Sequence, residues 1–307
     1  QRGAVAEADQ ILPDDIVPVF VLGSGRCGST LVQEVLARHP AMAFVSNIDD
    51  ILARFDRSGR WNNAVYRRVP QRFTQKGRVR FAPSEGYRLL DRAVSPMLVA
   101  PDRDLLATDA TPWLAERFQG LVARRVAAQH RNVFLHKFTG WPRARFLQAI
   151  FPNARFINIV RDGRAVANSW LQMDWWTGYR GVPGWTFGAL PPHYMDEWDA
   201  GRRTYSLLAG IGWKMLLDTS DDCEAALPAG SWLEIRYEDI LSNPHEQFSR
   251  MLEFMTVPAD RGFDRMLTSF GFSSAREAAF RHDLDGPALA ALDVSLGEHL
   301  AARGYVL

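Results

Sequence analysis

The residues from Gly23 to Thr30 have the composition of a loop that binds an anion. Three glycines in this segment let the backbone turn tightly, so that successive N–H groups can point at one ligand. Arg26 adds a cation, and the hydroxyls of Ser29 and Thr30 add donors. The spacing matches the phosphate-binding loop of nucleoside triphosphatases, G-x4-G-K-[ST], but Ser29 stands where that pattern has lysine. Binding of a β,γ-phosphate with magnesium is therefore not expected.

A second candidate anion site consists of Arg161 and Ser169. Arg161 ends an apolar run, and Ser169 lies eight residues later in a predicted helix. A forked cation beside one neutral donor suits a phosphate monoester. Asp162 occupies the place of a Walker-B carboxylate, which favours a nucleoside triphosphatase, although a helix N-cap is the alternative interpretation.

Both candidate sites follow predicted strands. Apolar runs predict strands over 17–22, 43–45, 133–136, 155–160 and 231–237, and helical patterns cover about 29–38, 143–151, 163–173 and 244–254. Strands that alternate with helices predict an α/β fold, P-loop-like and three-layered, with a central mostly parallel sheet flanked by helices. Ligands of such sheets bind at the carboxyl ends of the strands, so Arg161 is expected near the loop 23–30.

The 307 residues contain no repeat or obvious linker, and we interpret residues 1–307 as one domain. Two stretches interrupt the strand–helix alternation: a helical insertion over about 49–131, and a loop over about 172–198 that is rich in tryptophan and glycine. The second stretch is either a lid over a pocket or a loop that packs its own aromatic side chains against the body of the protein.

Composition excludes several classes of protein. The 36 Lys and Arg residues nearly balance 35 Asp and Glu, which disfavours a nucleic-acid partner or an acidic membrane. Apolar runs are shorter than the roughly 20 residues that span a bilayer, and no charged-then-apolar leader opens the sequence. Two cysteines cannot form a disulfide framework or a Cys-based zinc site. A cytoplasmic enzyme without a membrane span or a metal is expected, and its oligomeric state stays open.

The combined pattern resembles the sulfotransferase family, which uses 3′-phosphoadenosine 5′-phosphosulfate (PAPS). Residues 26–30 fit its [RK]-x-G-[ST]-T loop, and Arg161 with Ser169 fits its 3′-phosphate site. Residues 236–240 resemble its R-Y-E-D-[LI] segment, and residues 133–137 resemble a strand that ends in lysine. The chain looks closest to the bacterial, tyrosyl-protein-like branch rather than to the cytosolic aryl branch, whose loop carries Lys before Ser-Gly-Thr-Thr.

The resemblance implies a set of site residues. Arg26 and Lys137 are expected to stabilise the charge that develops on the bridging oxygen. The expected nucleotide-binding residues are Gly25, Arg26, Cys27, Gly28, Ser29, Thr30, Arg161, Ser169, Tyr237 and Arg281, with Ser273 and Ser274 as further candidates in a late loop.

The catalytic base is where this sequence departs from the family, in which a glutamate soon after the second strand acts as the base in several members. Here Ser46 or Asn47 occupies that place. We predict Asp49 or Asp50 as the base, with a helix cap as the alternative role for either. His136 and His193 are the other two candidates.

The predicted activity is transfer of a sulfuryl group from PAPS to a hydroxyl or amine of a small-molecule, glycan or lipid acceptor. Two alternatives stay open. One is a P-loop kinase or nucleoside triphosphatase with a degenerate lysine, and the other is a non-catalytic nucleotide-binding protein.

Overall fold

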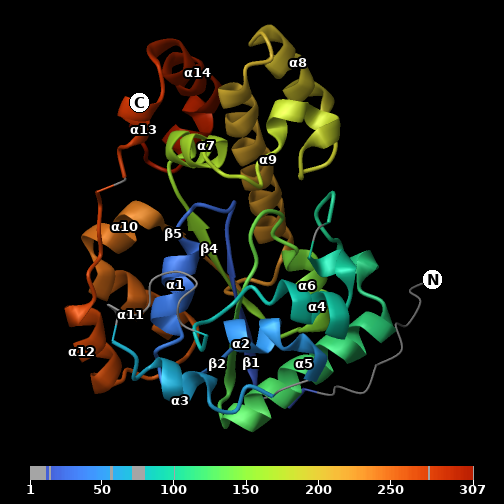
Figure 1. Ribbon diagram of the computed structural model, residues 1–307, viewed down its shortest axis with the longest axis vertical. Coiled ribbons are helices and arrows are strands. Elements are labelled where there is room, and N and C mark those ends of the chain that lie inside the picture. Colours follow the sequence, from blue (N-terminus) through green and yellow to red (C-terminus); the bar gives the residue numbers. More distant parts are fainter. Residues whose placement is uncertain are drawn as a thin grey trace.

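A parallel sheet forms the centre of the molecule (Figure 1). The computed structural model describes residues 12–13, 15–55, 58–70, 80–99, 101–275 and 277–306. Within these residues the sheet has five strands in the order β2-β3-β1-β4-β5, all parallel. The strands are β1 (Val17–Leu22), β2 (Met42–Ala43), β3 (Val133–Lys137), β4 (Arg155–Val160) and β5 (Trp232–Arg236). The predicted α/β fold is therefore confirmed.

Helices cover both faces of the sheet and extend beyond the carboxyl ends of its strands. The α-helices are α1 (Ser29–Leu36), α2 (Asn47–Ile51), α3 (Asn62–Tyr66), α4 (Tyr87–Ala93), α5 (Pro112–Gln129), α6 (Ala144–Ile150), α7 (Gly163–Leu171), α8 (Pro192–Ala200), α9 (Tyr205–Ala226), α10 (Tyr237–Ser242), α11 (Pro244–Phe254), α12 (Arg261–Ser269), α13 (Phe280–Asp283) and α14 (Gly286–Ala302). The 3-10 helices are η1 (Ala53–Phe55), η3 (Pro96–Leu98), η4 (Ala107–Asp109), η5 (Gly178–Arg180) and η6 (Val182–Gly184).

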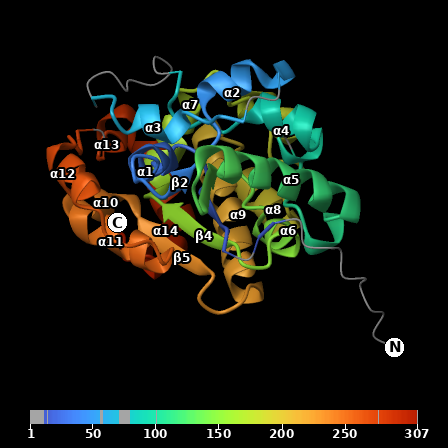
Figure 2. The same cartoon turned by 90° about the horizontal axis from the view of Figure 1, so that it is seen from below.

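Side chains alternate along β1 and supply two separate cores. Phe20 and Leu22 point to one face, where they pack with α5 and α6, whereas Val19 and Val21 point to the other, against α1, α11 and α12. Figure 2 shows α5 and α6 on one side of the sheet and α11 and α12 on the opposite side. Both faces of the central strand are buried, which explains why its sequence is continuously apolar.

The aromatic stretch 172–198 packs into a third core together with α7, α9 and α14. Trp176, Trp185 and Trp198 are buried in it, and Trp175 stays partly exposed. Burial of most of these rings supports the interpretation of a segment packed on the body of the protein, and it fixes α7 through Trp170, which stacks on Phe187.

The register of the sheet brings the predicted site residues to one edge. Val21 of β1 lies beside Lys137 of β3, and Leu22 lies beside Asn158 of β4. Strand β4 therefore runs two residues past the end of β1, to Val160, and carries Arg161 to the level of the loop 23–30.

The chain between β2 and β3 is helical in its described parts; residues 56–57, 71–79 and 100 of this insertion lie outside them. After α3 the insertion returns to the end of β2, where Ser46 and Pro83 form an antiparallel bridge and Ser84 N donates to Val45 O at 2.8 Å. This return places Glu85 at the same edge of the sheet as Lys137.

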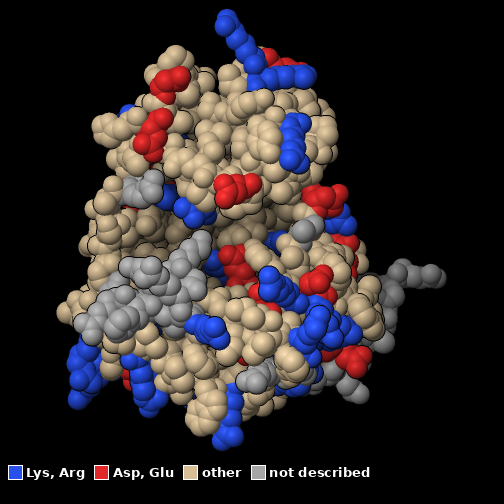
Figure 3. All heavy atoms as spheres, viewed as in Figure 1, with Lys and Arg blue, Asp and Glu red and all other residues tan. Residues whose placement is uncertain are grey.

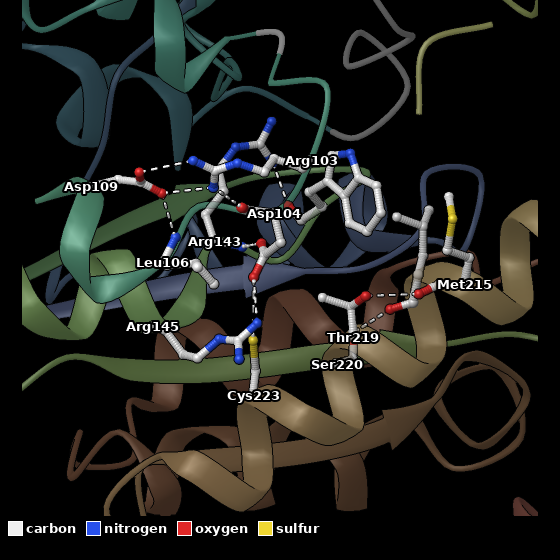
Figure 4. Close-up of polar contacts among 12 residues, drawn as sticks. Arg103, Asp104, Leu106, Asp109, Arg143, Arg145, Met215, Thr219, Ser220 and Cys223 are labelled. Carbon is white, nitrogen blue, oxygen red and sulfur yellow. Dashed lines mark hydrogen bonds and ion pairs between the residues drawn. The ribbon is translucent and has the colours of Figure 1, made fainter. Parts of the chain in front are cut away.

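Asp104 ties the insertion to the rest of the fold (Figure 4). Its Oδ1 accepts a hydrogen bond from Arg143 N at 2.6 Å, at the first turn of α6, and its Oδ2 lies 3.4 Å from Arg145 Nη2 and 3.7 Å from Cys223 Sγ of α9. Burial raises the pKa of the Asp104 carboxyl, and the bond from Arg143 opposes that rise. Burial also raises the pKa of the Cys223 thiol to about 12, so this cysteine is not a reactive thiolate.

We expect Asp104→Ala to lower the free energy of unfolding by about 1.5 to 3 kcal/mol, because it removes a charge-assisted bond and leaves the Arg143 amide without its acceptor. Asp104→Asn keeps an acceptor oxygen and should lose less. Chemical denaturation of both variants measures the difference, and equal stability of Asp104→Ala and the unsubstituted protein would contradict this role.

Candidate active site

The loop 23–30 follows β1 and ends at the first turn of α1. Gly25 and Gly28 have φ angles of +77° and +98°, and Arg26 has a φ of +60°. A Cβ at position 28 would lie 2.1 Å from a Tyr237 ring carbon, so only glycine fits under that ring. Cys27 points into the core beside Gly23. It can therefore offer a ligand its backbone but not its thiol.

The second predicted anion site lies directly against this loop. Arg26 Nε donates to Ser169 Oγ at 2.9 Å, and Arg161 Nη1 donates to Arg26 O at 3.1 Å. The Arg161 guanidinium carbon lies 5.0 Å from the centre of the Tyr237 ring. Four of the predicted residues thus form one cluster: Arg26, Arg161, Ser169 and Tyr237. Arg26 was predicted to act on the bridging oxygen, but here its side chain contacts Ser169 of the second anion site.

Lys137 connects the loop to a carboxylate. Its Nζ lies 2.7 Å from Thr30 Oγ1 and 2.8 Å from Glu85 Oε1, and its side chain is 3% exposed. The ammonium group is held between the start of α1 and the end of β2. A cation fixed in this way can stabilise negative charge on a group bound in the loop.

Glu85 is the site residue that sequence analysis missed. Its Oε2 accepts hydrogen bonds from Thr139 Oγ1 at 3.1 Å and from the Tyr87 hydroxyl, and its side chain is 26% exposed. The sequence offers one weak signal, the short Ser84-Glu85 segment between Pro83 and Gly86, which indicates a turn but not its place in space. Glu85 lies just after β2 in space, where we expected the base, but it comes from the middle of the insertion.

Asp49, one of the two residues predicted as the base, lies in a helix cap. It is the N3 residue of a capping box on α2, and its Oδ2 accepts bonds from Ser46 N at 2.8 Å and from Asn62 Nδ2 at 2.6 Å. Its Oδ1 lies 3.8 Å from Arg125 Nη1, and the residue is 3% exposed. The helix-cap alternative describes Asp49, since its oxygens are occupied and shielded from an acceptor.

The other three candidates for the base are Asp50, which joins two helices, His136, which is buried, and His193, which is exposed. Asp50 Oδ1 accepts a bond from Leu89 N at 3.0 Å and so joins α2 to α4. His136 is buried between Phe134 and Phe138, and burial, with Lys137 and Arg143 nearby, lowers its pKa to about 3. His193 is exposed on α8, against Tyr194.

The helix α13, at the end of the late segment 272–283, lies beside α7. Ser273, Ser274 and Arg281 are exposed, and the Arg281 guanidinium lies over the Phe280 ring at 5.2 Å. Asn168 Nδ2 donates to Asp283 Oδ2 at 2.9 Å, one residue before Ser169. This bond holds α13 next to the helix that carries Ser169. Within the described residues, Arg281 makes no hydrogen bond or ion pair with the loop 23–30.

Asp162 is the N-cap of α7 and not an open carboxylate. Its Oδ1 accepts bonds from Arg164 N at 2.9 Å and Arg164 Nε at 3.0 Å. Its own N–H donates to Glu238 Oε1, and Tyr305 OH donates to Glu238 Oε2 at 2.8 Å. Burial raises the pKa of Glu238. The R-Y-E-D segment therefore supports the turn after β4, and Asp162 is not available as a Walker-B acid.

The described residues contain no group of three or more His, Cys, Asp or Glu side chains that could hold a metal ion. None of the described helices combines the length and the apolar character needed to cross a bilayer. Figure 3 shows a hollow across the middle of the face seen in Figure 1, at the level where the strands end. The clustered cations and Glu85 occupy this edge of the sheet.

Comparison with curated proteins gives a relative that is a sulfotransferase. A curated relative, protein-tyrosine sulfotransferase A of Caenorhabditis elegans, is 21% identical over 242 residues, which are 79% of this chain and 50% of the relative. The chain thus spans about half the length of the curated relative that it matches.

Solved structures show a similar fold. The sulfotransferase domain of the Synechococcus PCC 7002 olefin synthase aligns over 96% of this chain and 98% of its own, with a TM-score of 0.52 and 20% identity. A sulfotransferase from Mycobacterium avium aligns over 96% of this chain and 79% of its own, with a TM-score of 0.55 and 14% identity. At these identities the likeness concerns the fold.

The sequence profile of the Sulfotransferase family matches residues 18–261. That range contains the sheet except for Val17, together with the loop 23–30, Lys137, the Arg161–Ser169 pair and the R-Y-E-D segment. Because the match covers most of the chain and these motifs, the chain belongs to the sulfotransferase family, as the sequence resemblance predicted.

Proposed function

We propose that this protein transfers a sulfuryl group from PAPS to the hydroxyl of an acceptor, with Glu85 as the base. One observation supports this function above the others: Lys137 Nζ lies within 2.8 Å of both Thr30 Oγ1 and Glu85 Oε1. A cation at the anion-binding loop thus meets a partly exposed carboxylate. Sulfuryl transfer needs a cation beside the leaving phosphate and a base beside the acceptor oxygen, on opposite sides of the sulfur.

The residues present suit the two anionic ends of PAPS. The loop amides, with Ser29, Thr30 and Lys137, would hold the 5′-phosphosulfate. Gly28 has no Cβ, which lets the Tyr237 ring pack directly against the loop. Arg161 and Ser169 would hold the 3′-phosphate, and Arg26 lies close enough to Ser169 to reach it. Tyr237 and Arg281 would line the nucleotide site.

Glu85 would act as the base on the acceptor side of the sulfur. In the transfer, a bond forms between the acceptor oxygen and sulfur while the bond from sulfur to the 5′-phosphate oxygen breaks. Glu85 would take the hydroxyl proton, and Lys137 would stabilise the charge left on the phosphate. Thr139 and Tyr87 keep the carboxylate of Glu85 in place. Asp49 and Asp50 have no part in this proposal, because their carboxylates hold α2.

The alternatives of the sequence analysis have less support. A kinase or nucleoside triphosphatase needs a cation in place of Ser29 and a free acid in place of Asp162, whereas Asp162 caps α7. We also propose a cytoplasmic location, since both cysteines are buried free thiols, as in reducing compartments.

The proposed activity is tested by incubating the protein with PAPS and a panel of alcohols, phenols, sugars and glycolipids. We expect formation of 3′-phosphoadenosine 5′-phosphate (PAP) together with an acceptor that has gained one sulfuryl group. ATP and magnesium in place of PAPS should give no turnover. Turnover with ATP alone would support the kinase alternative.

Arg161→Gln should weaken PAP binding by roughly 10- to 150-fold, because one charge-assisted contact to the 3′-phosphate contributes about 1.5 to 3 kcal/mol. Adenosine 5′-phosphate lacks that phosphate, so its affinity should change little. Titration calorimetry with both nucleotides measures the difference. An equal loss for both would place Arg161 away from the 3′-phosphate.

A further inference from the structure

A basic groove lies on the surface between η1, α4 and α5. It has a volume of about 580 Å³, and its lining includes Arg54, Arg92, Arg117, Arg124 and Trp113, with Glu116 as its carboxylate. Arg54 and Arg92 are exposed. Arg117 is held by the carbonyls of Arg92 and Val94 and stacks on Trp113 at 4.7 Å. The groove therefore combines a fixed aromatic wall with accessible guanidinium groups.

Large apolar side chains face solvent in the lining of the groove, at Trp113, and in the chain on either side of its lining residues Ala53 and Arg54. Ile51 is 59% exposed, Phe55 is 69% exposed and Trp113 is 57% exposed. Ile51 ends α2 and Phe55 ends η1, so both are close in the chain to Ala53 and Arg54, which line the groove. Exposed apolar groups gathered beside a charged groove are typical of an interaction surface.

The net charge of the chain conceals this local excess. Formal charge is only +1 over 307 residues, yet four arginines and one glutamate meet in the groove. Figure 3 shows basic side chains over α4, on the face that carries the central hollow, with some acidic side chains among them. A binding surface depends on this local distribution, which overall composition does not record.

We propose that this groove and its flanking side chains, Ile51, Phe55 and Trp113, dock the protein on an anionic lipid bilayer. Arginines at the surface would pair with lipid phosphates, and the exposed apolar side chains would enter the boundary between head groups and acyl chains. An acidic polypeptide would satisfy the arginines but leave Ile51 and Phe55 in water. The bilayer accounts for both features at once.

Docking through this groove would place the bilayer close to the candidate active site, because α4 connects the two. The helix begins at Tyr87, whose hydroxyl bonds Glu85, and its last turn supplies Arg92 to the groove. Its seven residues span only about 10 Å. A bilayer bound at the groove would therefore lie near the Glu85–Lys137 pair.

Vesicle sedimentation tests this proposal with the full chain and needs no knowledge of the acceptor. We expect the protein to sediment with vesicles of phosphatidylcholine and phosphatidylglycerol in equal parts, and far less with phosphatidylcholine alone. The double variant Arg54→Gln, Arg92→Gln should bind the anionic vesicles roughly 30-fold more weakly, since each basic residue near an anionic surface contributes roughly fivefold. Ile51→Ser with Phe55→Ser should also weaken binding.

The matched control is Arg261→Gln with Arg265→Gln on α12, which changes the net charge equally on exposed residues elsewhere. It should bind vesicles as the unsubstituted protein does. All variants should keep PAP affinity and melting temperature, which separates this proposal from the proposed function. Failure of the protein to bind anionic vesicles, equal loss in both double variants, or binding of polyglutamate without vesicle binding would overturn it.

Discussion

Glu85→Gln should lower the turnover number by about 10²- to 10⁴-fold, the usual contribution of a positioned base. Glutamine keeps the size of the side chain and an oxygen that can accept from Thr139 Oγ1, so the local fold should survive. It cannot accept a proton from the acceptor hydroxyl. PAP affinity should stay close to that of the unsubstituted protein, because Glu85 contacts Lys137 and not the Arg161–Ser169 pair. Steady-state kinetics with saturating PAPS, together with PAP titration, measures both quantities.

Asp50→Asn and Asp49→Asn are the matched controls for this experiment. Asp50→Asn should keep most of the turnover, since the amide oxygen can still accept from Leu89 N. Asp49→Asn should lower stability rather than turnover, because it weakens the capping box and leaves Arg125 without its carboxylate neighbour. If either asparagine variant abolishes transfer while Glu85→Gln is active, the base is that aspartate and our assignment is wrong.

Lys137→Met should lower the turnover number by about 10²- to 10³-fold, the usual effect of removing one donor that stabilises developing charge. Methionine fills the buried path of the lysine stem but offers no ammonium to Thr30 Oγ1 or Glu85 Oε1. The effect should fall mainly on turnover, because the loop amides and the arginines still bind the nucleotide. Rapid-quench measurement of the transfer step separates this loss from a slower product release.

A second buried lysine supplies the control for that substitution. Lys214 on α9 is 4% exposed, and its Nζ lies 2.6 Å from Glu197 Oε2, in the third core and away from the loop 23–30. Lys214→Met should lower the melting temperature and leave the turnover number unchanged at temperatures where the protein is folded. Equal losses of turnover in both methionine variants would mean that Lys137 acts through stability alone.

The double variant Glu85→Gln, Lys137→Met tests whether the two residues act together. Side chains in direct contact give non-additive effects. We therefore expect the double variant to lose less turnover than the product of the two single losses, as their 2.8 Å contact implies.

Local chemistry made several features predictable from the sequence alone. The spans 17–22 and 155–160 match β1 and β4 because continuous apolar runs bounded by polar or glycine residues define buried parallel strands locally. The residues of the loop 23–30 could be identified because glycines and hydroxyls in one short segment are themselves the anion-binding device. Arg161 and Ser169 followed from a strand end and a helical spacing.

Other features depended on which distant segments meet, and the sequence did not determine them. The strand order sets β3 and β4 on either side of β1, and only this order brings Lys137 and Arg161 to the two flanks of one loop. Arg26 turned toward Ser169 because α7 passes beside the loop, which no spacing in the chain records.

The candidate base shows most clearly which features the sequence determines and which depend on tertiary contacts. A carboxylate shortly after the second strand was the natural expectation, but Asp49 lies within a helix cap because its neighbours Ser46 and Asn62 need its oxygens. Glu85 lies 39 residues beyond Ser46 in the chain, and the Ser46–Pro83 bridge, with the backbone hydrogen bonds beside it, brings it to the site just after β2. Periodicity and motif spacing report contacts within a segment, whereas the path of an insertion is decided by the packing of its helices against the sheet. For this protein the sequence therefore determined the family, the strands and the anion-binding loop, and only the tertiary structure decided which carboxylate faces the lysine.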